Sequence, residues 1–388
     1  MPLPPLVEPG PPLTSAELAR YSRHVLIPGV GEQGQRRLRS ARVLVVGAGG
    51  LGSPALLYLA AAGVGTIGVV DFDVVDVSNL QRQVVHPSTA VGEPKVDSAA
   101  RTLAGVNPDV RVVPHRVHLD VDNILELVGQ YDVVLDGTDN FPTRYLVSDA
   151  CALAGKPLVW GSVLRFDGRV AVFWSAPPAG AVAVGYRDVF PNPPAPGTVP
   201  SCAEAGVLGA VCGVVGSAMA VEALKLILGV GEPLLGRMAA YDALSARWVE
   251  VPIRPAPGAS PVTRLQAYDE VCELPVALPE TGARALAQRL AARAAGDDEF
   301  DLVDVREPAE HALGTIPGAR LIPKGRFVDG EGFDELPRDR DVVLYCKAGV
   351  RSAEVLRLAT ARGFTRVSHV PGGVLEWIDE VDPALPRY

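Results

Sequence analysis

The chain has 388 residues, of which 48% are hydrophobic, and it carries a formal net charge of −9. This length favours two domains, and the apolar content is sufficient for sizeable cores. The acidic balance argues against nucleic acid as a partner.

The first residues, 1–12, are rich in proline, and we expect them to be disordered. They lack the basic start and the apolar core of a signal peptide. No apolar run in the chain reaches membrane-spanning length without interruption. The five cysteines lie far apart without regular spacing, which is typical of reduced thiols. We therefore expect a cytoplasmic enzyme with no membrane partner.

Residues 42–71 predict a strand, a glycine-rich turn, a helix and a second strand. The buried strand at 42–47 runs into a turn without β-carbons, and the helix follows at 51–62. Backbone N–H groups and the positive end of that helix form an anion site. The second strand, at 66–71, ends in Asp71, where a ribose-binding acid belongs. The glycines of the turn are Gly47, Gly49, Gly50 and Gly52.

Two cations soon after Asp71 favour cleavage of ATP over reduction of a nicotinamide. The glycine turn alone would fit a dinucleotide, but a nicotinamide enzyme has no need of further cations close by. Arg82 and Lys95, with Asn79 before them, could neutralise a triphosphate during attack at phosphorus. Asp139, at the end of a later strand, could hold Mg²⁺.

Strands and helices alternate up to about residue 163, which predicts an α/β fold with a mostly parallel sheet. We expect further strands at 110–115, 131–136 and 157–162, and further helices at 94–105, 121–129 and 143–154. Strands at 168–174 and 246–252 would extend the sheet in antiparallel fashion. A proline-rich crossover, 190–200, and a long apolar helix near 204–228 lie between those two strands.

This part of the chain, from about residue 21 to 254, resembles the ubiquitin-activating-like adenylyltransferases MoeB and ThiF. The motifs that carry the resemblance are Gly-Ala-Gly-Gly-Leu-Gly-Ser (47–53), Asp-Phe-Asp (71–73), Ser-Asn-Leu-Gln-Arg-Gln (78–83), Gly-Glu-Pro-Lys-Val (92–96) and Asp-Gly-Thr-Asp-Asn (136–140). The resemblance implies a Rossmann-like domain that adenylates the C-terminal glycine of a small ubiquitin-fold sulfur-carrier protein (MoaD/ThiS-like). It also implies a homodimer.

The same resemblance implies roles for the residues of an ATP site. Asp71 would hold the ribose, and Asp139 would position Mg²⁺. Arg82 and Lys95, with the partner subunit's Arg23, would stabilise charge on the phosphates. The residues expected to bind ATP are Gly47, Gly49, Gly50, Asp71, Asp73, Ser78, Asn79, Leu80, Gln81, Arg82, Lys95, Asp139 and Asn140.

The second domain carries a reactive cysteine. A helix is expected at 283–295, and strands are expected at 300–305, 341–345 and 366–370. Cys346 follows the second of these strands and precedes a helix near residue 352. The helix dipole, the loop N–H groups and two cations, Lys347 and Arg351, favour its thiolate. Only four residues separate Cys346 from Arg351, so the loop suits one extra sulfur atom better than a phosphate.

This domain resembles the single-domain rhodaneses over about 285–388. The motifs are Leu-Val-Asp-Val-Arg-Glu (302–307), Ile-Pro-Gly-Ala (316–319), Cys-Lys-Ala-Gly-Val-Arg-Ser (346–352) and Pro-Gly-Gly-Val-Leu-Glu-Trp (371–377). The resemblance implies a persulfide on Cys346. Arg306 and His311 are interpreted as structural or rim residues.

As a whole the chain is similar to the two-domain MoeZ type. We expect an adenylyltransferase domain at 13–254, a linker at 255–284 and a rhodanese domain at 285–388. The resemblance implies sulfur transfer from the Cys346 persulfide to the adenylated carrier, which gives a carrier thiocarboxylate. The sulfur donor could be thiosulfate or the persulfide of a cysteine desulfurase. The sequence does not name the carrier or its pathway, which could be molybdopterin, thiamine, cysteine, tRNA thiolation or secondary metabolism.

Cys202 lies after the proline-rich crossover and before a helix, which again favours a thiolate. Its position resembles that of the cysteine of related adenylyltransferases that can bond covalently to the carrier. Cys202 could therefore cut the S–S bond that follows sulfur transfer, or it could simply cap the helix. Cys151 and Cys212 are expected in the core.

One feature departs from the MoeB pattern. That family usually has two Cys-x-x-Cys pairs that hold zinc, but the corresponding stretches, 183–187 and 257–262, contain no cysteine. Four sulfur ligands cannot be assembled, so we predict no structural zinc.

Two alternative functions remain open at this point. One is a nicotinamide-dependent oxidoreductase fused to a phosphatase-like domain, against which Arg82, Lys95 and the short Cys346 loop argue. The other is a non-catalytic scaffold that binds the carrier, against which an intact Cys346 and Arg82 argue.

Overall fold

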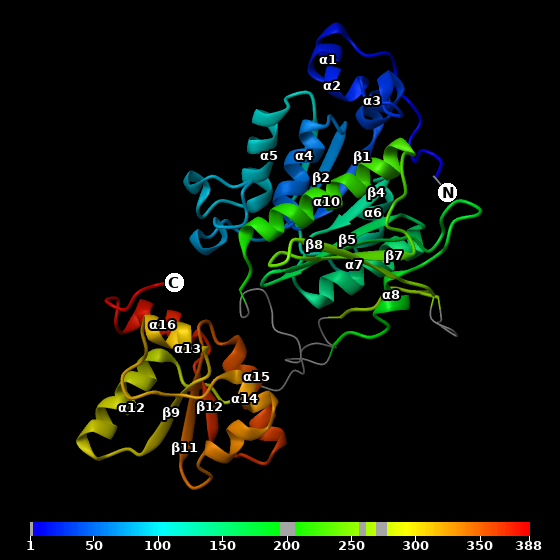
Figure 1. Ribbon diagram of the computed structural model, residues 1–388. Coiled ribbons are helices and arrows are strands. Elements are labelled where there is room, and N and C mark those ends of the chain that lie inside the picture. The colour runs from blue at the N-terminus through cyan, green and yellow to red at the C-terminus, as the bar shows by residue number, and fades with distance from the viewer. Residues whose placement is uncertain (1–2, 195–205, 256–260, 269–277) are drawn as a thin grey trace. The chain divides into compact units, whose positions relative to one another are not determined.

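The structure is a computed structural model that describes residues 3–194, 206–255, 261–268 and 278–388. The chain divides into two compact units (Figure 1). One is formed by Met1–Pro194 and Pro200–Cys272, and the other is built on Glu273–Tyr388. The division falls within the predicted linker, 255–284.

The first unit is built on an eight-stranded sheet. Its strands are β1 (Arg42–Val46), β2 (Thr66–Val70), β3 (Arg111–His115), β4 (Val133–Asp136), β5 (Leu158–Leu164), β6 (Asp167–Phe173), β7 (Arg237–Asp242) and β8 (Arg247–Pro252). They lie in the order β3-β2-β1-β4-β5-β6-β7-β8. The first five are parallel, and β5 to β8 pair in antiparallel fashion. The predicted α/β fold with a mostly parallel sheet is confirmed, whereas β7 is an additional strand.

Helices cover both faces of this sheet (Figure 1). Those that pack on the first face are α3 (Gly31–Ser40), α4 (Gly52–Ala61), α5 (Lys95–Val106) and α10 (Gly209–Leu228), and those on the second are α6 (Ile124–Gly129), α7 (Phe141–Ala154) and the short α8 (Tyr186–Val189). Alternate residues of β1 enter the two cores: Val43 and Val45 join the first, and Leu44 and Val46 join the second. A strand that is buried on both faces explains the unbroken apolar run of the sequence.

The register of the central strands brings three loops together. Val46 pairs with Val70 of β2 on one side and with Asp136 of β4 on the other. The residues that follow these strands therefore meet at one edge of the sheet. The strand order changes direction between β1 and β4, and such a point leaves a crevice at the carboxyl ends of parallel strands.

Helix α10 is the long apolar helix expected from the sequence, and it begins at Gly209 instead of near residue 204. By length and composition alone it could cross a membrane, the one helix within the described part of the chain that passes this test. It packs against α4, β5 and β6, and 61% of its most apolar stretch is buried. Burial of this kind is typical of a core helix.

The predicted disorder of residues 1–12 is wrong for the described residues of this segment. The Leu6 N–H donates to the Leu226 carbonyl at 3.0 Å. The side chains of Arg36 and Arg37 donate to carbonyls of residues 10 and 7 at 2.7 and 3.1 Å. The prolines of this segment have no N–H groups to donate to its carbonyls. The arginines of α3 act as donors to these carbonyls instead. Leu3, Leu6 and Val7 also pack on the first core.

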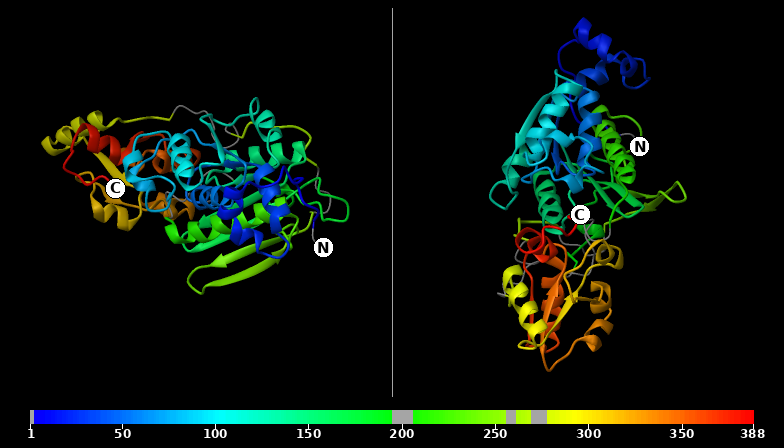
Figure 2. Two further views of the ribbon diagram at one scale, coloured as in Figure 1. Left: turned by 90° about the horizontal axis from the view of Figure 1, so that it is seen from above. Right: turned by 90° about the vertical axis from the view of Figure 1, so that its left-hand side faces the viewer.

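Short helices and a hairpin complete the first unit. Helices α1 (Ser15–Arg20) and α2 (Ser22–Val25) precede α3. Strands β7 and β8 form a hairpin that extends from the sheet in Figure 2. Every residue of β8 is exposed, although the Trp248 ring lies 4.8 Å from the Tyr241 ring of β7, between ring centres.

The second unit has a four-stranded parallel sheet. Its elements are α12 (Ala283–Ala295), β9 (Phe300–Asp304), α13 (Pro308–Leu313), β10 (Arg320–Leu321), α14 (Lys324–Val328), β11 (Asp341–Tyr345), α15 (Val350–Ala361), β12 (Val367–His369) and α16 (Gly373–Glu380). The strand order is β10-β9-β11-β12. One core lies between the sheet and α14 and α15, and the other lies between the sheet and α12 and α16. The predicted smaller α/β domain is confirmed.

Candidate active sites

A cavity lies where the loops after β1, β2 and β4 meet, and it gathers most of the residues expected to bind ATP. The expected residues that line it are Gly47, Gly49, Gly50, Asp71, Asp73, Asn79, Arg82, Lys95, Asp139 and Asn140. Separate motifs, spread over almost a hundred residues of sequence, thus form one wall.

The glycine turn is tied to the acid at the end of β2. Gly47 has a φ of +89°, and a β-carbon there would lie 3.3 Å from the Gly137 carbonyl oxygen. The Asp71 carboxylate accepts the N–H of Ala48 and the N–H of Asp73, both at 2.9 Å. Burial raises the pKa of Asp71 above its ordinary value, although Lys95 and these N–H groups oppose the shift. The carboxylate is therefore held in place before any nucleotide arrives.

Lys95 is the first residue of α5, and it is nearly buried. Its side chain is 7% exposed, and its Nζ lies 2.8 Å from Oδ2 of Asp73, which is half exposed. The sequence predicted a cation at this place but not its carboxylate partner. A phosphate that binds Lys95 must compete with Asp73, or the two must share the ammonium.

Several predicted residues do not line this cavity. Ser78, Leu80 and Gln81 are absent from its wall among the described residues. The Ser78 side chain donates to Asp76 at 2.6 Å, inside the short helix η1 (Val77–Asn79), and this turn directs Asn79 and Arg82 to the cavity instead. Arg23 lies on α2 with an exposed side chain, away from the cavity of its own chain. Cys202 lies outside the described residues.

Three polar side chains in or beside the cavity were missed by the sequence analysis. His86 contacts the Ala48 carbonyl at 2.9 Å and the Ser98 hydroxyl at 3.0 Å, and burial lowers its pKa. Gln83 lines the cavity, and its buried Oε1 has no hydrogen-bond partner among the described residues. Arg144 also lines it and donates to the Thr138 carbonyl at 2.7 Å. Gln83 is the last residue of the motif 78–83, and Arg144 follows the motif 136–140 by four residues, which is the signal that could have found them.

Magnesium fits this cavity only together with a substrate. No group of three or more His, Cys, Asp or Glu side chains that could hold a metal occurs in the described ranges. Asp139 is an exposed carboxylate on the cavity wall. Mg²⁺ is commonly bound by one or two carboxylates plus the phosphates of its nucleotide, so this donor set suits a nucleotide-borne ion.

Polar contacts hold one of the loops where relatives of the MoeB type would bind zinc. The Gly185 N–H donates to the Asp188 carboxylate at 2.7 Å. Arg187 forms an ion pair with the buried Asp149 at 2.8 Å, and both contact the Tyr268 hydroxyl. Residues 256–260, part of the second stretch, are outside the described residues. The absence of zinc stays a prediction, which metal analysis of the purified protein tests.

The second site is the loop from Cys346 to the start of α15. Cys346 directly follows β11 and is 1% exposed. The carbonyls of Cys346 and Lys347 accept the N–H groups of Val374 and Leu375, at 2.8 and 3.1 Å. Gly349 has a φ of +86°, and a β-carbon there would lie 1.6 Å from the Pro371 carbonyl oxygen. The loop thus closes tightly against the start of α16, and only glycine fits at its apex.

The two cations of this loop have partners. Arg351 donates to both oxygens of Glu310, at 2.6 and 2.7 Å. Burial opposes ionisation of Glu310, but Arg351 outweighs it and holds the pKa of that carboxyl below its ordinary value. Lys347 Nζ lies 4.9 Å from the centre of the Tyr388 ring. The charge of Arg351 is therefore balanced by a carboxylate.

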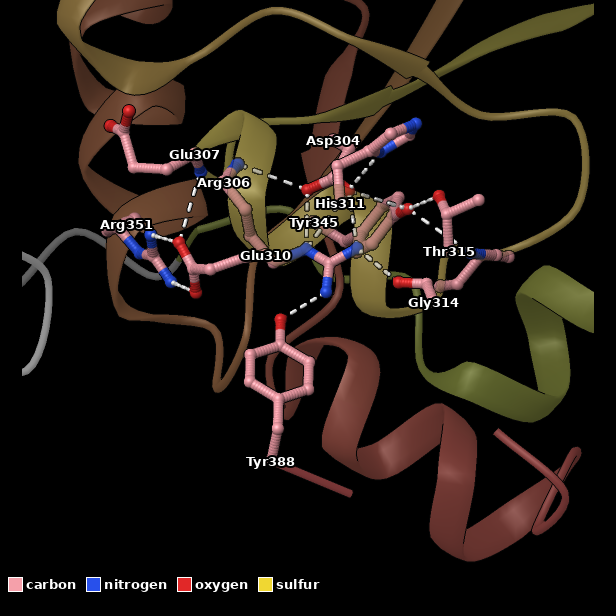
Figure 3. A network of polar contacts seen from close by, with 11 residues as sticks. Asp304, Arg306, Glu307, Glu310, His311, Gly314, Thr315, Tyr345, Arg351 and Tyr388 are labelled. Atoms are coloured by element: carbon pink, nitrogen blue, oxygen red, sulfur yellow. Dashed lines mark hydrogen bonds and ion pairs between the residues drawn. The ribbon is translucent and has the colours of Figure 1, made fainter. Parts of the chain in front are cut away.

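A network of polar contacts surrounds Asp304 and includes Tyr345, the residue before Cys346 (Figure 3). Its carboxylate accepts from Arg306, with a shortest distance of 2.6 Å, and from the Tyr345 hydroxyl at 3.1 Å, and its Oδ2 lies 2.9 Å from His311 Nδ1. Arg306 is fully buried and also donates to the Tyr388 hydroxyl. Arg306 and His311 thus contact structural partners, and Tyr345 immediately precedes Cys346.

Comparison with known proteins finds a family match for each of the two units. The ThiF family model matches residues 21–262, which is more than half of the chain. The chain belongs to the ThiF family. In this ThiF-family protein a rhodanese-like domain matches residues 286–380.

Two relatives and one solved structure are similar to this ThiF-family protein. It is 51% identical to the probable adenylyltransferase/sulfurtransferase MoeZ of Mycobacterium tuberculosis, over 100% of this chain and 99% of that one. It is 52% identical to a sulfur carrier protein adenylyltransferase of Thermus thermophilus, over 67% of this chain and 98% of that one. The crystal structure of E. coli MccB with MccA-N7isoASN shares the fold, with a TM-score of 0.55 and 20% identity over 64% of this chain and 75% of that one.

The protein is therefore an adenylyltransferase and a sulfurtransferase, and its adenylation uses ATP. The two alternatives, a nicotinamide oxidoreductase and a non-catalytic scaffold, are set aside. The MoeZ-type resemblance that the motifs predicted is confirmed over the whole chain.

Proposed function

We propose that the first unit adenylates the C-terminal glycine of a small ubiquitin-fold sulfur carrier, and that Cys346 then supplies sulfur to it. The observation that carries this proposal is the presence of two sites in one chain. One is a cavity with Asp71, Arg82 and Lys95, and the other is a closed loop around a buried cysteine. The Thermus thermophilus relative, named a sulfur carrier protein adenylyltransferase, supports this class of partner.

In the first step a carboxylate oxygen of the carrier attacks the α-phosphorus of ATP. A new P–O bond forms, the bond to the bridging oxygen breaks, and pyrophosphate leaves with the electron pair. Asp71, fixed by two N–H groups, would bind the ribose. Arg82 and Lys95 would stabilise charge on the phosphates. Asp139 would hold Mg²⁺, which supplies further positive charge to the phosphates when bound.

In the second step sulfur passes through Cys346. Its thiolate attacks the outer sulfur of a donor; with thiosulfate, sulfite leaves, and with a desulfurase persulfide, a cysteine thiolate leaves. The terminal sulfur of the new persulfide attacks the acyl adenylate, a C–S bond forms, and AMP leaves. A thiol then attacks the sulfur of Cys346 and releases the thiocarboxylate. We propose Cys202 as this thiol, and an external thiol must afterwards reduce the resulting disulfide.

We also propose a homodimer. An apolar groove lined by Pro54, Tyr58, Val84 and Val214 lies between α4 and α10. Tyr58 is 59% exposed and Val84 is 60% exposed, so the groove offers apolar surface for a second copy. The partner subunit's Arg23 would then reach the ATP site.

We expect this enzyme in the cytoplasm.

Replacement of the cysteine separates the two activities. Cys346→Ala should abolish sulfur transfer from thiosulfate and leave carrier-dependent ATP–pyrophosphate exchange near the wild-type rate, because Cys346 lies in the other unit from the ATP cavity. Steady-state assays of both reactions on the same preparation measure this. Loss of both activities in a mutant that keeps its melting temperature would refute the two-site proposal.

A further inference from the structure

A buried histidine lies directly behind the sulfur-transfer loop and has no part in the function described so far. His369 ends β12 and is 5% exposed. Its Nδ1 lies 3.3 Å from the hydroxyl oxygen of Ser352, on the first turn of α15. That oxygen lies 3.7 Å from the sulfur of Cys346. The three side chains therefore form a continuous buried row, from the cysteine to the histidine.

The hydroxyl of Ser352 has two acceptors for its single proton. The Gly349 carbonyl lies 2.9 Å away, and the sulfur of Cys346 is the second. Ser352 is fully buried, so its hydroxyl has no access to bulk water. A third neighbour, His369, withdraws this proton from both acceptors if it accepts, and leaves the proton to them if it donates.

The protonation of His369 follows from its surroundings. Burial lowers the pKa of its imidazole, so the ring is neutral at pH 7 and only one of its nitrogens carries a proton. The charged groups that face it are Glu280, Arg357 of α15 and Glu376 of α16, and the Gly349 backbone carbonyl accepts a hydrogen bond from the ring. The Glu376 carboxylate already accepts the N–H groups of Gly372 and Ala283, at 2.8 and 3.1 Å.

We propose that His369 is a positioning residue for sulfur transfer, which donates from Nδ1 to Ser352 and so leaves the serine proton available to the sulfur of Cys346. A serine that donates to sulfur stabilises the anionic forms of that atom, the thiolate before loading and the persulfide after it. With the opposite tautomer the serine would donate to the histidine, and the sulfur would lose this contact. The inference rests on the proposed role of Cys346 as the sulfur carrier.

Alkylation of Cys346 measures the effect without any carrier protein. Full-length wild type, His369→Leu, His369→Asn and Ser352→Ala are treated with iodoacetamide between pH 5 and pH 9, and the Cys346 peptide is followed by mass spectrometry. We expect His369→Leu to slow alkylation at pH 7 roughly tenfold and to shift the rate profile to higher pH. A tenfold effect is the scale expected for loss of one hydrogen bond to an anion. His369→Asn keeps an N–H close to the position of Nδ1 and should recover most of the rate.

A double variant separates this role from simple packing. If His369 acts through Ser352, His369→Leu combined with Ser352→Ala should be no slower than Ser352→Ala alone. The inference would be overturned if the two rate losses multiplied in the double variant, or if the alkylation profile of His369→Leu equalled that of wild type. ATP–pyrophosphate exchange and the melting temperature serve as controls for folding. If wild-type Cys346 reacts with iodoacetamide but never accepts sulfur from thiosulfate or a persulfide, the proposed function fails instead.

Discussion

Single residues of the ATP cavity show how far a motif defines a site. Asp71, Arg82 and Lys95 were recognised from their spacing after the glycine turn, and all three line the cavity. The sequence could not reveal that Lys95 is paired with Asp73, because this contact joins residues 22 positions apart. His86 was missed for the same reason, since its partner, the Ala48 carbonyl, lies 38 positions away.

The ion pair gives Lys95 a defined position before the nucleotide binds. Lys95→Ala should reduce adenylation by roughly 10²- to 10³-fold, the usual scale for loss of one preorganised group that stabilises transition-state charge. Sulfur transfer from thiosulfate should be unchanged. ATP–pyrophosphate exchange with saturating carrier is the measurement. A rate close to that of wild type would show that Lys95 serves only to pair with Asp73.

At the scale of elements, the periodic segments were predicted well and the irregular ones were not. Strands β1 and β2 and helix α12 lie within one or two residues of their predicted bounds. Strand β10 has only two residues, which is too short for any periodicity. The N-terminal segment was misjudged because its order depends on arginines of α3, about 30 positions further along the chain.

Helix α10 is the element that joins the core to the ATP loop. A β-carbon on Gly216 would lie 2.3 Å from the Leu51 carbonyl oxygen, in the turn that opens α4. This close approach explains why a glycine stands inside a long helix, where it otherwise costs stability. The glycine turn of the cavity is thereby supported from outside by the face of α10.

Substitution at that contact tests the packing. Gly216→Val should lower the free energy of unfolding by about 1–3 kcal/mol, as expected of an overpacked core. Gly213→Val is the matched control on the same helix, because a β-carbon there would have no described atom within 4 Å apart from its chain neighbours and the nearby helix backbone. Urea unfolding of both variants measures the difference. Equal stability of the two variants would contradict the assigned contact.

At the scale of the whole molecule, the proposed dimer makes each ATP site depend on two chains. Arg23→Ala and Asp139→Ala should each be inactive alone in adenylation, because each lacks one contributor to every site. Mixed after subunit exchange, they should regain activity, since one of the two shared sites in a heterodimer is intact. No recovery, once exchange is verified by native mass spectrometry, would count against the partner subunit's Arg23.

The two units combine a step that makes a reactive acyl adenylate with a step that consumes it. A carboxylate is a poor acyl donor, and its bond to AMP supplies a good leaving group. The acyl adenylate is also easily hydrolysed, so the presence of both activities in one chain shortens its exposure to water. The sequence predicted this division of labour because each chemistry depends on short motifs, one set in each part of the chain, whereas the identity of the carrier leaves no such motif.

Intact-mass spectrometry of the carrier tests the central claim most directly. Candidate ubiquitin-fold proteins that end in glycine are incubated with the enzyme, ATP, Mg²⁺, thiosulfate and a thiol reductant. We predict that the true partner gains mass equal to the replacement of one oxygen by one sulfur, and that Cys346→Ala prevents this gain. A carrier that is adenylated by the wild-type enzyme but never acquires sulfur, with thiosulfate or with a desulfurase persulfide as donor, would contradict the account.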